Sequence, residues 1–164
     1  MTVEIVYIRE DLIPDWRSAC EAVASERIYL GRIAFPPLDA FKAFPIKVIN
    51  NDWPMYCALD GSALVGWADV TPVDIPECTH RGALGMGVLA SHRRQGIGGQ
   101  LLEACLAHCF RNSIEKVELT VYTTNTAAIA LYRKHGFTDI GVIRDYRRLD
   151  DQIYDALLME KFLR

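Results

Sequence analysis

The spacing of apolar positions changes period several times along the chain, which predicts a mixed α/β fold. The run VEIVYI at 3–8 is rich in β-branched residues and predicts a first strand. From Leu12 onward the apolar positions recur at helical spacing, which predicts a helix. The stretch 26–54 contains prolines and no sustained period, so we expect a loop with short helical pieces there.

The second half of the chain repeats this alternation with clearer boundaries. Two apolar runs within 55–70 flank Asp60-Gly61, a dipeptide typical of a tight hairpin turn. The other elements that we expect are a strand at 82–90, a helix from about Gly98 to Arg111, a strand at 116–121, a helix at 126–136 that Gly136 closes, and two long strands around a turn at 150–152. This order predicts a single mixed α/β domain over residues 1–164.

Composition and charge narrow the class of protein. Of the 164 residues, 51% are hydrophobic and 24% are charged, which is ordinary for a globular domain. The net charge of −3 argues against a general role in coating nucleic acid or anionic membranes. The apolar runs are far shorter than the ~20 residues that span a bilayer, and the N-terminus lacks the pattern of a signal peptide. We therefore expect a cytoplasmic protein with neither a nucleic-acid nor a membrane partner.

The cysteines predict buried thiols. Their odd number and irregular spacing argue against a disulfide framework. Cys105, His108 and Cys109 share one predicted helix, but no second pair of ligands completes a closed zinc site. We expect no metal.

The stretch SHRRQGIGGQLL at 91–102 joins a predicted strand to a predicted helix and predicts a pyrophosphate site. A helix start exposes N–H groups that lack intrahelical partners, and glycines let phosphate oxygens approach them. Arg93 and Arg94 add positive charge. The spacing is not that of an ATP or GTP P-loop. A dinucleotide fingerprint also fails, because Leu101 stands where its third glycine belongs, although Glu118 lies where a ribose-binding acid would be expected.

Two blocks of sequence resemble the GNAT superfamily of acyl-CoA-dependent N-acetyltransferases. Arg93-x-x-Gly96-x-Gly98 resembles its [Q/R]xxGx[G/A] signature, with Ala90 in place of the usual upstream proline. The stretch YTTNTAAIALYRKHGF resembles the block NxxAxxLYxxxGF and matches it at Asn125, Ala128, Leu131, Tyr132, Gly136 and Phe137. The resemblance implies a splayed mixed sheet of about six to seven strands flanked by helices, with acetyl-CoA as cosubstrate.

The resemblance also implies roles for individual residues. The strand at 83–89 would pair with the pantetheine arm through Met86 and Val88. The pyrophosphate would be held at Arg93 and by the amides of Arg94, Gln95, Gly96, Ile97, Gly98 and Gly99. Asn125 and Tyr132, seven residues apart on one helix face, would contact the arm and its sulfur. Tyr132 is expected to protonate the departing thiolate, and the Val88 N–H to stabilise the developing oxyanion.

The acceptor side is less defined by the sequence. His80 and Glu118 are both conceivable general bases, because each flanks a strand that should part from its neighbour. Carboxylates near the acceptor would attract a cationic amine, and aromatic rings would accommodate an apolar side chain. The residues in segments that border such a site are Glu26, Tyr29, Phe35, Trp67 and Asp69. Each of them also fits a place in the core or on the solvated surface.

These expectations favour an N-acetyltransferase that acts by direct transfer in a ternary complex. The tail at 141–159 is similar to that of GNATs that acetylate amino acids or polyamines, so a small primary amine is the expected acceptor. Protein N-termini are an alternative acceptor, and a non-catalytic CoA-binding regulatory module is an alternative class. A homodimer through the C-terminal hairpin is left open.

Overall fold

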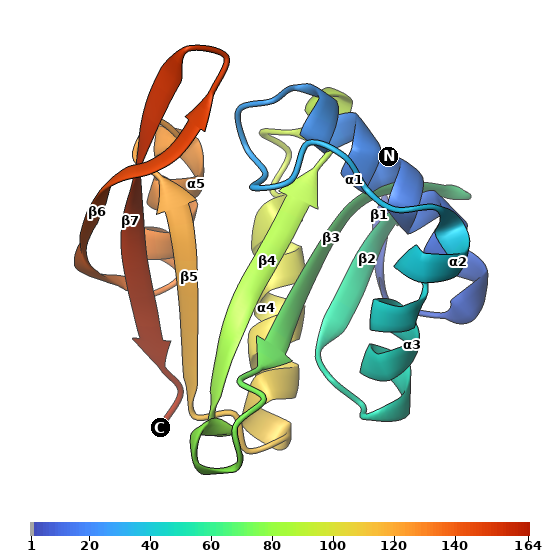
Figure 1. Ribbon diagram of the computed structural model, residues 1–164. Coiled ribbons are helices and arrows are strands. Elements are labelled where there is room, and N and C mark those ends of the chain that lie inside the picture. Colours follow the sequence, from blue (N-terminus) through green and yellow to red (C-terminus); the bar gives the residue numbers. More distant parts are fainter. Residues whose placement is uncertain (1) are drawn as a thin grey trace.

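The computed structural model describes residues 2–164, and its elements follow the predicted order (Figure 1). The strands are β1 (Val3–Tyr7), β2 (Met55–Asp60), β3 (Ala63–Pro72), β4 (Arg81–Val88), β5 (Lys116–Tyr122), β6 (Thr138–Leu149) and β7 (Gln152–Phe162). The helices are α1 (Ile13–Ser25), α2 (Leu38–Phe41), α3 (Ala43–Asn50), α4 (Ile97–Arg111) and α5 (Thr126–Lys134). The short helices α2 and α3 confirm the expectation for 26–54. None of the helices within 2–164 combines the length and the apolarity needed to cross a bilayer.

The strands form one splayed sheet in the order β1-β2-β3-β4-β5-β7-β6. Only β4 and β5 are parallel neighbours, and they pair only from Arg81–Ala83 to Lys116–Glu118. Beyond these pairs the two strands separate toward their C-terminal ends, and Figure 1 shows the resulting V-shaped gap. The predicted fold class, a splayed mixed sheet with flanking helices, is thereby confirmed.

The helices cover the two faces of the sheet with separate cores. In Figure 1, α4 and α5 lie behind the sheet, and α1, α2 and α3 lie in front of it. The core on the α4 side includes Leu101, Leu102 and Met159, whereas Trp16 and Met55 belong to the core on the α1 side. The α4-side core includes residues of both β5 and β7 and packs against Met86 and Val88 of β4, so it continues across the gap on that face.

Two local motifs fix the second half of the chain as the sequence predicts. The β6–β7 turn uses Asp150 and Asp151 with φ of 53° and 59°, the left-handed pair of a type I′ hairpin. At the end of α5, Gly136 takes φ of 86° and donates to the Arg133 carbonyl. Phe137 N–H donates to the Tyr132 carbonyl, which completes a Schellman motif. Gly136 is therefore the closing residue that was expected.

Candidate active site

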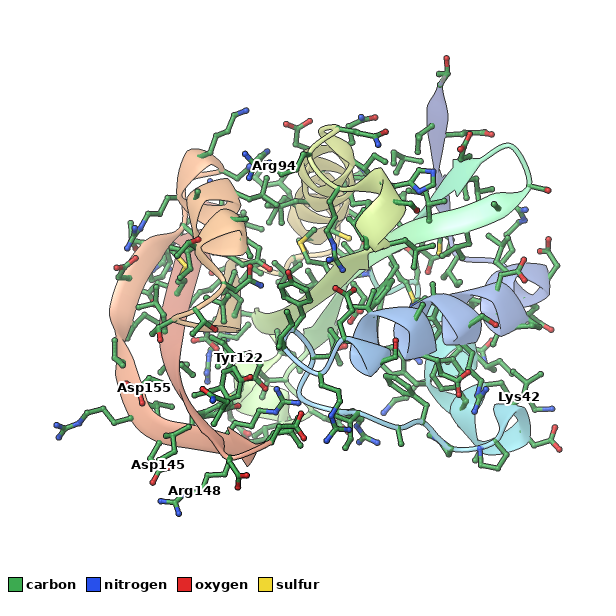
Figure 2. All side chains as sticks on the ribbon, turned by 90° about the horizontal axis from the view of Figure 1, so that it is seen from above. Lys42, Arg94, Tyr122, Asp145, Arg148 and Asp155 are labelled. Carbon is green, nitrogen blue, oxygen red and sulfur yellow. The ribbon has the colours of Figure 1, made fainter. Side chains whose placement is uncertain are left out.

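The segment between β4 and α4 presents a row of free backbone amides. Arg94 and Gly96 take positive φ angles of 63° and 80°, so the chain turns sharply before α4 begins. No hydrogen bond within residues 2–164 uses the N–H groups of residues 94–99 as donors. Alternating right- and left-handed residues that aim successive amides at one point form an anion-binding concavity. Figure 2 shows Arg94 on the α4 and α5 side of the molecule. We call residues 94–99 the amide cradle.

The glycines of the cradle serve different purposes. A Cβ on Gly98 would lie 3.2 Å from Leu131 Cδ2 and 3.4 Å from Met86 Cε, and one on Gly99 would lie 3.3 Å from His135. At these two positions α4 packs closely against α5 and β4, and a side chain would require its neighbours to shift. Gly96 has open space around it and is required by its positive φ instead.

The side chain of Arg93 is engaged away from the cradle. Its Nε donates to the Val88 carbonyl at 2.9 Å, and Nη1 donates to Glu26 at 2.8 Å. Its guanidinium also lies 4.6 Å from the centroid of the Tyr29 ring. The positive charge of Arg93, expected to reinforce anion binding, is instead paired with Glu26. Arg93 thus joins the end of β4 to the loop that follows α1, whereas Arg94 is exposed beside the amides.

The edge of β4 that faces β5 offers its backbone groups to the gap. The His80 carbonyl, just before β4, accepts from Lys116 N–H of β5, so even-numbered residues direct their backbone groups toward β5. Met86 and Val88 follow this alternation, and β5 does not pair with them. Their N–H groups therefore point into the gap, as pairing with an extended arm requires.

Tyr132 is a buried residue of α5 with a protonated hydroxyl. It is 8% exposed, and the Schellman motif and a ring contact of 5.8 Å to Phe137 hold it in place. Burial raises the pKa of its phenol to about 12. Its hydroxyl makes no hydrogen bond within the described part of the chain, so it retains a proton and has no competing partner. Asn125 caps α5 by accepting from Ala128 N–H at 3.3 Å.

On the face of β4 opposite α4, two positions are glycines and leave room for side chains of β3. Gly85 pairs with Asp69, and Gly87 pairs with Trp67. A Cβ on Gly85 would lie 3.3 Å from Asp69 Oδ1, and one on Gly87 would clash with the Trp67 ring. The side chains of Asp69 and Trp67 on β3 thus approach these two glycines closely. Trp67 is 4% exposed, belongs to the α1-side core and lies against Gly87, whereas Phe35 packs against Phe41 in the same core.

Glu118 and His80 are placed poorly for a general base. Glu118 accepts from Arg81 at 2.7 Å and pairs with Lys116 at 3.0 Å. The hydrogen bond from Arg81, assisted by Lys116, holds the pKa of Glu118 below its usual range despite partial burial. Glu118 lines a cavity of about 440 Å³ at the closed end of the gap. His80 is exposed and precedes β4, so it lies at the end of the strand remote from the cradle.

Arg147 on β6 is not among the site residues that the sequence predicts. Its guanidinium lies 5.2 Å from the ring centroid of Tyr122 and 5.3 Å from that of Tyr154. Nη1 donates to the Arg27 carbonyl at 3.2 Å, and the buried Nη2 has no partner within residues 2–164. Figure 2 shows Tyr122 on the inner side of the β6–β7 hairpin. Arg147 is therefore a cation without a carboxylate, held beside the open end of the gap.

A bulge in β6 places Arg147 there. Ile143 pairs with Ala156 and Arg147 pairs with Tyr154, so residues 144–146 lie opposite Asp155 alone. Asp145 takes φ of 53°, and its N–H donates to Asp155 Oδ1 at 2.8 Å (Figure 2). No alternation in the sequence signals this bulge.

The thiols and histidine of α4 have structural partners. Cys105 Sγ donates to the Ala68 carbonyl at 3.2 Å, and His108 contacts Tyr56 Oη and Asp52. All five cysteines are free. Across residues 2–164, no three His, Cys, Asp or Glu side chains gather as metal ligands.

Comparison with known proteins identifies the family. The model of the acetyltransferase (GNAT) family matches residues 8–137. The [ribosomal protein bS18]-alanine N-acetyltransferase of Escherichia coli is 32% identical over 90 residues, which are 55% of this chain and 59% of that protein. The chain thus spans about three fifths of that relative's length. The L-amino acid N-acetyltransferase AaaT of E. coli is 25% identical over 158 residues, 95% of this chain and 97% of that protein.

A solved structure shares the fold at lower identity. An acetyltransferase from Salmonella typhimurium with its cofactor acetyl-CoA superposes with a TM-score of 0.93 at 14% identity, over 100% of this chain and 95% of that one. With the family match to residues 8–137, these findings show that the chain belongs to the GNAT acetyltransferase family.

Proposed function

We propose that this protein is an acetyl-CoA-dependent N-acetyltransferase whose acceptor is a small primary amine that carries a carboxylate, as a free amino acid does. The observation that carries the proposal is the parting of β4 and β5 beyond Ala83 and Glu118, together with the free amides of the cradle that follows β4. A ligand can bind there with its phosphates on one side of the sheet while an amine approaches from the other.

The residues of the gap fit acetyl-CoA. The amides of 94–99, at the positive end of the 15-residue helix α4, suit a pyrophosphate. The outward N–H groups of Met86 and Val88 suit an extended arm that contains amides. Acetyl-CoA supplies the reactive acetyl thioester. The Val88 N–H is our candidate donor to its carbonyl oxygen, and Tyr132 is our candidate donor of a proton to the sulfur.

Arg147 supports an acceptor that carries a carboxylate. The Arg147 guanidinium forms no ion pair within residues 2–164 and lies against the contacting rings of Tyr122 and Tyr154, so it is well suited to donate to a carboxylate in a bidentate pair. A polyamine would instead meet charge repulsion there. The full-length similarity to an L-amino acid N-acetyltransferase is consistent with this choice.

A protein N-terminus is the second candidate acceptor. The relative that acts on alanine of ribosomal protein bS18 supports it. The N-terminal residue of a protein has no free α-carboxylate, so Arg147 would need another partner. The non-catalytic module is disfavoured by the free hydroxyl of Tyr132.

The test is a thiol-release assay with acetyl-CoA and matched acceptors. We expect free amino acids to react faster than their decarboxylated amines and faster than short peptides. A preference for peptides would support the N-terminal alternative. If acetyl-CoA binds but no amine causes release of the CoA thiol, the result would support the regulatory module and refute the enzyme.

A further inference from the structure

The proposed reaction needs a proton acceptor that neither Glu118 nor His80 supplies. An amine is cationic at neutral pH and must lose a proton before its nitrogen can attack a carbonyl carbon. Glu118 is neutralised by two cations, and His80 lies at the wrong end of β4. The inference below rests on the proposed function and concerns the carboxylate of Asp69 on β3.

Asp69 lies beside one of the glycines of β4. Its partner in the sheet is Gly85, and its Oδ1 lies 3.3 Å from the point where a Cβ of Gly85 would stand. Gly85 is exposed, so this oxygen adjoins open surface. Side chains alternate across a strand, and Met86 points toward Gly98 and α4. Asp69 is therefore on the face opposite the cradle, where an amine would enter.

The carboxylate of Asp69 has almost no partners. Its one hydrogen bond comes from Thr71 Oγ1 at 3.4 Å, and no Lys, Arg or His of residues 2–164 forms an ion pair with it. The titratable groups that its charge influences are thiols, namely Cys20 of α1, Cys57 of β2 and, from the other face of the sheet, Cys105 of α4.

These surroundings set the protonation state of Asp69. Burial raises the pKa of each of the three thiols, so they are neutral near pH 7. Burial also raises the pKa of Asp69 to about 7, against a small opposing effect of the Thr71 hydrogen bond. Such a group exchanges a proton readily at neutral pH.

We propose that Asp69 is the general base that takes the proton from the acceptor ammonium, directly or through one water. The amine nitrogen then forms its bond to the acetyl carbon as the carbon–sulfur bond breaks. The second nitrogen proton leaves to solvent, and the departing sulfur takes the proton of Tyr132. Tyr132 is reprotonated from solvent, and the proton on Asp69 is lost to solvent before the next turnover.

The test is the pH profile of the Asp69→Asn variant with the best amino acid acceptor. The wild-type profile of kcat/KM should show an acid limb with a midpoint near 7. In the variant this limb should disappear, and the rate should rise with pH up to the pKa of the amine itself. At pH 7 we expect kcat to fall about 10²-fold, with the affinity for acetyl-CoA unchanged.

A matched variant and a binding control distinguish a wrong assignment of the base from misfolding and from absence of the proposed activity. Glu118→Gln removes a carboxylate of β5 that was itself a candidate base, and it should keep the acid limb near 7. If Glu118→Gln loses the limb, or Asp69→Asn keeps it, Asp69 is not the base although the enzyme assignment stands. An unchanged acetyl-CoA-induced rise in Tm shows that each variant is folded. Absence of turnover in the wild type overturns the proposed function and this inference together.

Discussion

Tyr132 is held by its own helix end rather than by polar partners. The Schellman motif uses its carbonyl, and the ring packs against Phe137, so the hydroxyl is free for a ligand. We expect Tyr132→Phe to lower kcat about 10²-fold, because the phenol proton is lost while the ring packing is kept. Steady-state kinetics with calorimetric binding of CoA would check this. A fully active variant would reduce Tyr132 to a packing residue.

Arg147 gives a prediction about specificity. In Arg147→Met the side chain still packs against the rings of Tyr122 and Tyr154, but the positive charge is removed. A charge-assisted hydrogen bond contributes about 1.5–3 kcal/mol, so KM for an amino acid should rise about 10- to 100-fold. KM for the decarboxylated amine should change little. Equal effects on both acceptors would argue against a carboxylate contact.

Asp69 gives a prediction about stability that does not depend on turnover. Its pKa of about 7 in the folded protein exceeds the value of about 3.9 in an unfolded chain. The folded state therefore binds the proton more tightly, and its stability falls as pH rises between these values. We expect Asp69→Asn to raise Tm relative to the wild type more at pH 8 than at pH 5. Equal differences at both pH values would contradict the raised pKa.

At the scale of elements, substitution of two glycines tests whether the β4–α4 junction binds CoA. Gly96 and Gly61 both have positive φ and open space where a Cβ would stand. Alanine at either position costs about 1–2 kcal/mol of backbone strain. Gly61 lies in the β2–β3 turn and is not a residue of the cradle, although its neighbour Asp60 contacts His92 at 3.1 Å. We therefore expect Gly96→Ala to weaken CoA binding about tenfold or more and Gly61→Ala to leave it unchanged.

Gly98 is a less specific probe of the same junction. A bulky residue there would collide with Leu131 and Met86, so it would disturb the packing of α4 on α5 as well as any phosphate contact. The Gly96→Ala and Gly61→Ala variants avoid this packing change, so calorimetric titration of CoA into both compares a substitution in the cradle with one outside it. Equal losses of affinity in both variants would indicate strain rather than a cradle.

The elements that were predictable carry local signals. Gly136 and the Asp150-Asp151 turn are predictable from their residue types. The two glycine-containing blocks predict the β4–α4 junction and helix α5. The positions of Asp69 and Arg147 depend on long-range pairing. Asp69 lies beside Gly85 because β3 pairs in one register with β4, and Arg147 lies against Tyr122 and Tyr154 because β6 bulges opposite Asp155. The partnership of Arg93 with Glu26 likewise joins residues far apart in the chain.

At the scale of the whole molecule, binding of acetyl-CoA should stabilise the fold. A ligand at 100 times its Kd stabilises the folded state by about 2.7 kcal/mol. For a domain of this size that corresponds to a rise in Tm of roughly 5–10 °C. Thermal unfolding with acetyl-CoA, CoA and NAD in parallel would check this, and we expect no rise with NAD. No rise with saturating acetyl-CoA would contradict the cradle.

The parting of β4 and β5 also creates two strand edges in the interior of the sheet. Free edges normally invite pairing with other chains, which leads to aggregation. Here the Arg27–Asp150 ion pair, with Nε and Oδ2 2.7 Å apart, links the loop after α1 to the tip of the β6–β7 hairpin. This link limits access to the inner edges from the open end. A slender amide-containing ligand fits such an opening better than a foreign β-strand does, so the architecture exposes backbone groups for binding without offering a template for self-association.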